Sequence, residues 1–159
     1  MKSKTCCFSG HRKIPSTLIS DICIETEKAI EDLIKEGYCY FGSGGALGFD
    51  TIAAISVIKL RRKYPFIHLI LVLPCLSQTR NWMLEDKKTY EKIKKSADKV
   101  VYVSKQYTKD CMFRRNRHLV DNSSVCICYL TDQSGGTAYT VNYAEEKGLR
   151  IINIAKRIF

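Results

Sequence analysis

Three short glycine-containing segments hold residue types that bind anions. The first, Ser9-Gly10-His11-Arg12, ends an apolar run. Gly10 lets the chain turn there, so that His11 and Arg12 project from the turn. Arginine suits bidentate contacts with phosphate or carboxylate groups. The alternative is a solvated arginine beside a packed histidine, and these residues alone do not choose between the two.

The second segment, residues 42–50, reads G-S-G-G-A-L-G-F-D. Its glycines allow a ligand close to the backbone, and free N–H groups at a helix start attract anions. It is neither the G-x-G-x-x-G fingerprint nor a Walker loop, because no G-K-[ST] follows. Asp50 suits two roles, orienting a ribose hydroxyl or capping the first helical turn. We predict ligand contacts at Ser43, Gly44, Gly45, Gly48 and Asp50.

The third segment, Ser134-Gly135-Gly136-Thr137-Ala138, again leads from a strand pattern into a helical one. It repeats the anion-binding arrangement, and the Thr137 hydroxyl adds a donor. Two such turns at one sheet edge would hold a ligand from two sides. We therefore predict contacts from Gly135, Gly136 and Thr137.

Two further stretches hold candidate ligand-binding residues. Within residues 113–118, Arg114 and Arg117 share a helical face while Arg115 points elsewhere, so one arginine is expected to meet the ligand. Asn116 can read a base or ribose edge. Trp82 either stacks on a base or covers the core. We include Trp82, Arg115, Asn116 and Arg117 among the predicted ligand-binding residues.

The hydrophobic pattern predicts how these segments are positioned. Apolar runs predict strands at 5–9, 38–41, 67–73, 99–103, 124–130 and 150–154, and helical spacing predicts helices at 15–36, 46–63, 80–96, 112–121 and 136–147. Strict alternation implies right-handed β-α-β crossovers. The expected fold class is α/β, a Rossmann-like three-layer sandwich with a mainly parallel sheet. Ligands bind beyond the carboxyl ends of such strands, so Gly10, Gly44 and Gly135 should share one edge.

Length and composition set the remaining limits. The 159 residues suit one domain spanning 1–159, without linker or repeat. There are 26 Lys and Arg against 16 Asp and Glu, a net charge of +10 that favours anionic partners: nucleotides, nucleic acid or acidic proteins. No apolar run approaches the roughly 18 residues that span a bilayer. The first residues lack secretory-signal features, so we expect a cytoplasmic protein without a membrane partner.

The eight cysteines predict free thiols. Most fall in apolar strand-like runs, where cysteine acts as a small buried hydrophobe. Cys126 and Cys128 share a strand face, but no second Cys/His pair stands at metal-ligand spacing. We therefore predict no metal site and no required cofactor beyond a nucleotide-type ligand.

Together these motifs are similar to the YpsA-like family of the SLOG superfamily. The similar residues span nearly the whole chain: Gly10-His11-Arg12, residues 42–50, Tyr102-Val103-Ser104-Lys105, Arg115-Asn116-Arg117, Asp121 and residues 135–141. The resemblance implies a Rossmann-like fold and a nucleotide-type ligand. Its relatives include DNA-processing protein A, the "lonely guy" phosphoribohydrolases and sensors of ADP-ribose-type signals. Related domains often dimerise, so a homodimer is expected.

The chain departs from the hydrolase relatives at one motif. Their P-G-G-x-G-T-x-x-E ends in a glutamate, whereas residues 134–142 here read S-G-G-T-A-Y-T-V-N. Asp50 and Glu145 are the carboxylates that would have to replace it. We therefore expect a sensor or sequestering module for a nucleotide such as NAD or ADP-ribose. A nucleotide N-glycoside hydrolase and a single-stranded DNA-binding protein are the alternatives.

Overall fold

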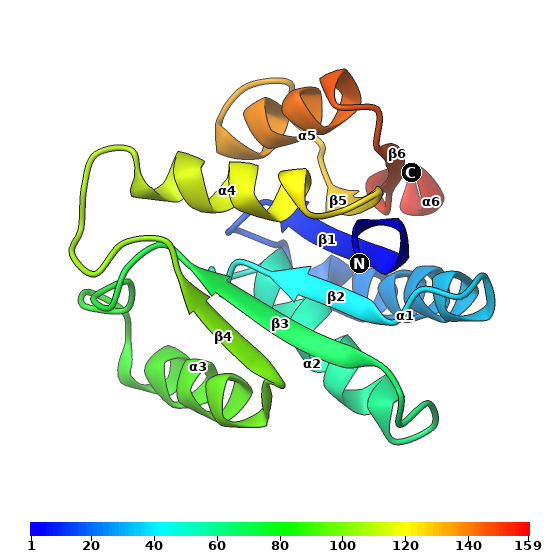
Figure 1. The fold of residues 1–159 in the computed structure, drawn as a ribbon, viewed down its shortest axis with the longest axis horizontal. Helices are drawn as coiled ribbons and strands as arrows, with labels where there is room; N and C mark the ends of the chain where they lie inside the picture. The colour runs from blue at the N-terminus through cyan, green and yellow to red at the C-terminus, as the bar shows by residue number, and fades with distance from the viewer.

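The computed structural model describes residues 1–159 as a parallel sheet between two layers of helices (Figure 1). The six strands are β1 (Thr5–Gly10), β2 (Tyr40–Ser43), β3 (His68–Leu73), β4 (Lys99–Tyr102), β5 (Val125–Tyr129) and β6 (Arg150–Asn153). The helices are α1 (Ile19–Lys35), α2 (Phe49–Arg61), α3 (Leu84–Ser96), α4 (Cys111–Asp121), α5 (Gly136–Glu146) and α6 (Ala155–Ile158), with single 3-10 turns η1 (Lys2–Lys4) and η2 (Ser16–Leu18). This confirms the predicted α/β, Rossmann-like sandwich.

Side-chain alternation along the strands separates two cores. On β1, Phe8 faces a core formed with α1, α2 and α3, whereas Cys7 faces a smaller core beneath α4 and α5. On β5, Ile127 faces the first core, and Cys126 and Cys128 face the second. Successive strand side chains point to opposite faces, so both faces of a central strand must be apolar. This is why the strands read as nearly continuous hydrophobic runs.

The strand order, β4-β3-β2-β1-β5-β6, places a crevice at the centre of the sheet. The chain adds β2, β3 and β4 on one side of β1, and then crosses to add β5 and β6 on the other. Both neighbours pair with β1 in parallel, with Cys6 beside Phe41 on one side and Val125 on the other. The connections leave β1 and β5 in opposite directions, so a crevice opens between their carboxyl ends.

Element boundaries differ from the predicted ones mainly at helix starts. α2 begins at Phe49 rather than residue 46, because Gly48 has a φ of 76° and ends the turn before it. α3 begins at Leu84 rather than residue 80, since residues 77–82 form turns and a bend. β2 spans 40–43 rather than 38–41, because its ladder with β1 starts at Tyr40. The short α6 was not predicted.

All eight cysteines are free thiols. Burial, reinforced by Cys7, raises the pKa of Cys128 to about 12, so this thiol stays protonated at neutral pH. No cluster of His, Cys, Asp and Glu side chains is placed to hold a metal ion. None of the helices is long and apolar enough to cross a bilayer.

We expect the Phe41→Ala substitution to lower the free energy of unfolding by about 3–5 kcal/mol, the usual cost of removing a buried phenyl ring. Phe41 is fully buried in the larger core. The matched control is Phe66→Ala, which removes a ring that is 56% exposed and should change stability by less than about 0.5 kcal/mol. Urea denaturation followed by circular dichroism measures both values. Equal losses would contradict this assignment of the core.

Candidate functional site

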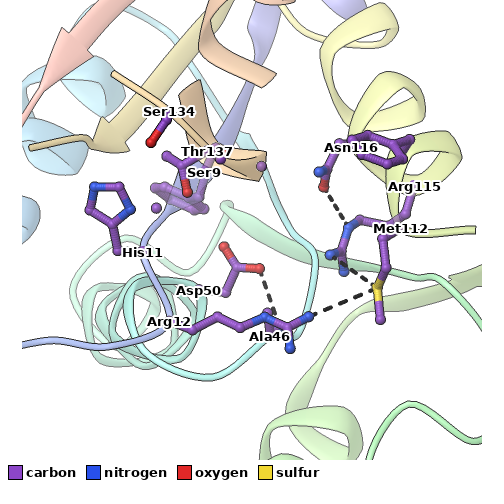
Figure 2. Close-up of a pocket in the computed structure, with 15 residues that line it drawn as sticks. Ser9, His11, Arg12, Ala46, Asp50, Met112, Arg115, Asn116, Ser134 and Thr137 are labelled. Carbon is purple, nitrogen blue, oxygen red and sulfur yellow. Dashed lines mark hydrogen bonds between the residues drawn. The ribbon is translucent and has the colours of Figure 1, made fainter. Parts of the chain in front are cut away.

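A pocket of about 310 Å³ lies in the crevice between the carboxyl ends of β1 and β5 (Figure 2). Four segments far apart in sequence line it: the turn after β1, the loop leading into α2, the first turns of α4, and the turn before α5. Nine predicted residues are among its walls, namely Gly10, His11, Arg12, Asp50, Arg115, Asn116, Gly135, Gly136 and Thr137. The three glycine-containing segments thus meet at one edge of the sheet.

His11 connects the turn after β1 to the segment after β5. Its Nε2 accepts a hydrogen bond of 2.9 Å from the Thr131 backbone N–H. A nitrogen that accepts cannot carry a proton, so the neutral ring has its proton on Nδ1. The ring also packs edge-on against Tyr129, with 5.9 Å between centroids. A backbone group therefore sets the tautomer of His11, which the sequence did not reveal.

Asp50 forms part of the pocket floor although only 6% of it is exposed. Its Oδ2 accepts a hydrogen bond of 3.2 Å from the Ala46 N–H, which closes the glycine-rich turn, while Oδ1 accepts no hydrogen bond from the chain. Burial raises the pKa of Asp50, and the nearby Arg115 opposes that rise. The side chain caps the loop rather than α2 itself, and one oxygen remains available to a ligand.

Arg115 is the arginine of its cluster that turns inward, and only 4% of it is exposed. Its guanidinium donates to the Gly44 carbonyl and, at 2.7 Å, to the Asn116 side-chain oxygen. Its remaining nitrogen lies 3.8 Å from the Met112 sulfur, which also lies 3.9 Å from a nitrogen of Arg12 (Figure 2). Burial lowers the pKa of Arg115, and Asp50 opposes that change. Most donors of Arg115 therefore bind the protein itself.

The start of α5 faces the pocket without a side chain covering it. Ser134, Gly135, Gly136 and Thr137 all line the pocket, and no side chain caps the helix. Gly135 has a φ of 94°, a conformation that only glycine adopts without strain. The first N–H groups of a helix have no partner within the helix. Those of α5 are therefore available to an anion in the pocket.

Four predicted residues of the second segment do not line the pocket. Ser43 is buried and bonds the Gly45 N–H at 3.3 Å, so it shapes the turn. A Cβ atom on Gly44 would lie 2.6 Å from the Arg115 guanidinium, and one on Gly45 would lie 2.6 Å from Leu73. Gly48 allows the turn after β1 to cross over α2, because a Cβ there would collide with the Arg12 carbonyl oxygen. These residues shape the loop, and Ala46 lines the pocket instead.

Three other candidates also lie elsewhere. Trp82 is partly buried against the larger core and packs edge-on against Tyr90, with 5.4 Å between centroids. Arg117 is exposed and donates to the Tyr139 hydroxyl at 3.1 Å. Glu145 is exposed near the end of α5 and does not line the pocket. Asp50 is therefore the one carboxylate among the lining residues.

Sequence reasoning missed several lining residues: Phe8, Ser9, Ala46, Met112, Phe113 and Ser134. Ser9, Ala46 and Ser134 lie inside the motifs considered, so their places in those motifs were a usable signal. Met112 and Phe113 immediately precede the arginine cluster in the first turn of α4. No sequence signal indicated that these two apolar side chains face a ligand site.

The chain is similar in sequence to known proteins. A model described as the YspA SLOG family matches residues 12–154. The chain is 29% identical over 130 residues to the SPβ prophage-derived protein YoqJ of Bacillus subtilis, covering 74% of this chain and 76% of that protein. It is 33% identical over 124 residues to a UPF0398 protein of Halalkalibacterium halodurans, covering 76% of this chain and 66% of that protein.

The fold is also similar to that of a solved structure, DNA processing protein A from Helicobacter pylori, a protein with a single-stranded DNA binding mode. The TM-score is 0.67 at 18% sequence identity, and the match covers 94% of this chain and 64% of the other. This similarity establishes the shared Rossmann-like fold.

We expect Arg115→Ala and Arg117→Ala to differ sharply in stability. Removing Arg115 leaves the buried Gly44 carbonyl with only the 3.4 Å bond from Gln78 and takes away one of the two cations near Asp50, which should cost about 1.5–3 kcal/mol. Arg117 is exposed, so its loss should cost less than about 0.5 kcal/mol. Urea denaturation measures both values. If Arg115→Ala has the same free energy of unfolding as the wild type, the Arg115 side chain does not stabilise the loop that lines the pocket.

Proposed function

Since the chain belongs to the YspA SLOG family, we propose that its pocket binds a nucleotide or nucleotide-derived ligand by its phosphate. The observation that carries the proposal is the uncapped start of α5, which faces the pocket through residues 134–137. Backbone N–H groups and the helix dipole favour an anion there. The ligand class we propose is NAD- or ADP-ribose-like, and the role is that of a sensor or sequestering module.

The charges around the pocket support an anionic ligand. Arg12 lines the pocket, and the only hydrogen bond of its side chain is a long one to the Met112 sulfur. Neither Arg12 nor Arg115 forms an ion pair with a carboxylate. Most N–H donors of the Arg12 guanidinium are therefore free to bind a phosphate. The planar guanidinium suits a bidentate contact with phosphate oxygens.

The remaining polar groups suit a ribose. Asp50 presents one carboxylate oxygen without a partner, and the neutral His11 ring presents an Nδ1 proton when Nε2 accepts from Thr131. A carboxylate can accept bonds from both hydroxyls of a ribose diol. A volume of about 310 Å³ is at the small end of the range for ligand pockets. We therefore propose that the pocket holds one ribose phosphate unit.

Binding without turnover is the activity we favour. A hydrolase needs groups that act on the transition state beyond ground-state binding. The turn before α5 lacks a following glutamate, and Glu145 is outside the pocket. The pocket is thus rich in anion-binding groups and poor in acid and base groups.

N-glycoside hydrolysis is a second candidate, favoured by one observation. Asp50 is a buried carboxyl group in the pocket, and its pKa is raised by that burial. Groups with such shifted pKa values occur often at catalytic sites. In this reaction, water would replace the base at the ribose C1′ atom, and Asp50 would hold or transfer the proton.

A single strand of nucleic acid is the third candidate partner. DNA processing protein A from Helicobacter pylori, which shares the fold, has a single-stranded DNA binding mode. The pocket here suits about one ribose phosphate unit, so a strand would need additional surface outside it.

The Gly136→Asp substitution tests the anion site. A Cβ atom at Gly136 would meet nothing within 4 Å, so the variant should fold, while its carboxylate would repel a phosphate. We expect calorimetry with ADP-ribose or AMP to show no binding, whereas Gly136→Ala binds. Arg12→Ala should weaken binding by about 1.5–3 kcal/mol, and Arg12→Lys should recover part of the loss. Unchanged binding by folded Gly136→Asp would remove the start of α5 from the site.

Incubation of the protein with NAD and ADP-ribose, followed by chromatography over hours, tests turnover. We expect the nucleotides to remain intact. The matched variant is Asp50→Asn, which keeps an acceptor for the Ala46 N–H but cannot act as an acid. Multiple turnovers that yield free base and are lost in Asp50→Asn would establish the hydrolase instead.

A further inference from the structure

A row of aromatic and basic side chains runs along α4 and α5, which lie side by side (Figure 1). We call it the aromatic–basic ridge, and its members are Phe113, Arg117, Tyr139, Tyr143 and Lys147, all of them exposed except Tyr143, which is half-buried. The Phe113 and Tyr139 rings meet edge-on, with 4.9 Å between centroids. The Arg117 guanidinium lies 5.8 Å from the Tyr139 ring centre and 6.0 Å from that of Tyr143. The Lys147 ammonium lies 5.4 Å from the Tyr143 ring centre.

The ridge begins at the mouth of the pocket and is accessible to solvent. Phe113 lines the pocket and is 42% exposed, and Tyr139 is 36% exposed. Neither ring belongs to either hydrophobic core. Exposed rings in contact with each other form a contiguous apolar patch, and such patches mark interaction sites more often than single exposed side chains do. A ligand that extends from the pocket would reach these rings first.

The cations of the ridge are free of carboxylate partners. Every ion pair in the structure is formed by a cation of another region: Lys28, Lys59, Arg61, Lys63, His68 or Arg150. Within α4 itself, three arginines stand against one carboxylate, that of Asp121. Such unpaired charge attracts polyanions.

A second aromatic–basic cluster provides a contrast at the other end of the sheet. Phe66 packs edge-on against Tyr64, and Lys63 lies 5.4 Å from the Tyr64 ring centre. There, however, Glu31 accepts from both Lys63, at 3.0 Å, and the Tyr64 hydroxyl, at 2.6 Å. The nearby carboxylate neutralises that cluster. On the ridge, Asp121 bonds only the Tyr143 hydroxyl and pairs with no cation.

We propose that the aromatic–basic ridge binds single-stranded nucleic acid, with bases stacking on Phe113 and Tyr139 and phosphates meeting Arg117 and Lys147. Alternating aromatic rings and cations is the arrangement that holds single strands without reading their sequence. The proposal rests on the proposed function in one respect, since the terminal nucleotide of the strand would occupy the phosphate pocket beside Phe113.

The test is fluorescence anisotropy with 5′-phosphorylated oligothymidylate and oligouridylate of about 12 nucleotides, within the usual site sizes. We expect Phe113→Ala and Tyr139→Ala to weaken binding about 5- to 150-fold, the effect of losing one stacked base. Tyr139→Phe keeps the ring and should bind nearly as wild type. Arg117→Ala should lower the slope of log affinity against log salt by about 0.7, one phosphate contact. Comparing the two strands shows whether DNA or RNA is preferred.

The controls are Phe66→Ala and Lys63→Ala, which remove a matched ring and charge from the neutralised cluster and should leave strand binding unchanged. If the control variants lose as much strand affinity as the ridge variants, the proposal is wrong. It is also wrong if folded Tyr139→Ala binds the strand as strongly as the wild type. Sedimentation velocity identifies the competing outcome, in which the strand does not bind and the ridge variants instead dissociate a dimer.

Calorimetry with AMP separates this proposal from that for the pocket. Tyr139 and Arg117 do not line the pocket, so Tyr139→Ala and Arg117→Ala should bind AMP as wild type does. If the protein binds AMP but no single strand, the proposal for the ridge is wrong and the proposal for the pocket stands. If the protein binds no AMP, but binds a single strand in a way that Phe113→Ala and Tyr139→Ala weaken, the proposal for the ridge is supported and the proposal for the pocket is wrong.

Discussion

A buried guanidinium facing a buried carboxyl group is the constraint on which the pocket depends. Arg115 and Asp50 are 4% and 6% exposed, yet they do not form an ion pair. Arg115 instead donates to the Gly44 carbonyl and the Asn116 side chain, and one oxygen of Asp50 accepts from the Ala46 N–H. A charge in a protein interior is costly without such partners. The turn, α4 and α2 must therefore keep one arrangement, and the pocket lies where they meet.

This arrangement leaves the pocket with an uneven distribution of charge. The start of α5 and Arg12 attract anions, and between them lies the single carboxyl group of the pocket, that of Asp50 (Figure 2). A phosphate and a ribose differ in the same way, one strongly anionic and the other a donor of hydroxyl hydrogen bonds. The site thus matches the polarity of a ribose phosphate, and it does so mainly with groups that bind rather than groups that transfer protons.

Paired and unpaired charges also lie on different parts of the molecular surface. On the side of α1 and α2, acidic residues pair with lysines and arginines, so the basic excess there is neutralised. Around the pocket and along α4, the cations have no such partners, and exposed rings lie among them. Positive charge without local compensation attracts anions over a Debye length of about 8–10 Å. The unpaired cations therefore attract anions both to the pocket and to the aromatic–basic ridge beside it.

The sequence by itself determined the alternation of strands and helices, because a strand buried on both faces reads as a continuous apolar run. That alternation was enough to bring the three glycine-containing segments to one edge. It did not determine that β5 lies beside β1, since strand order follows from long-range pairing rather than local pattern. Only the tertiary structure decided that Arg115 turns inward while Arg117 stays on the surface. It also decided that Gly45 lies against Leu73 and that Thr131 sets the His11 tautomer. The physical reason is that each of these outcomes depends on an atom contributed by a segment distant in the chain.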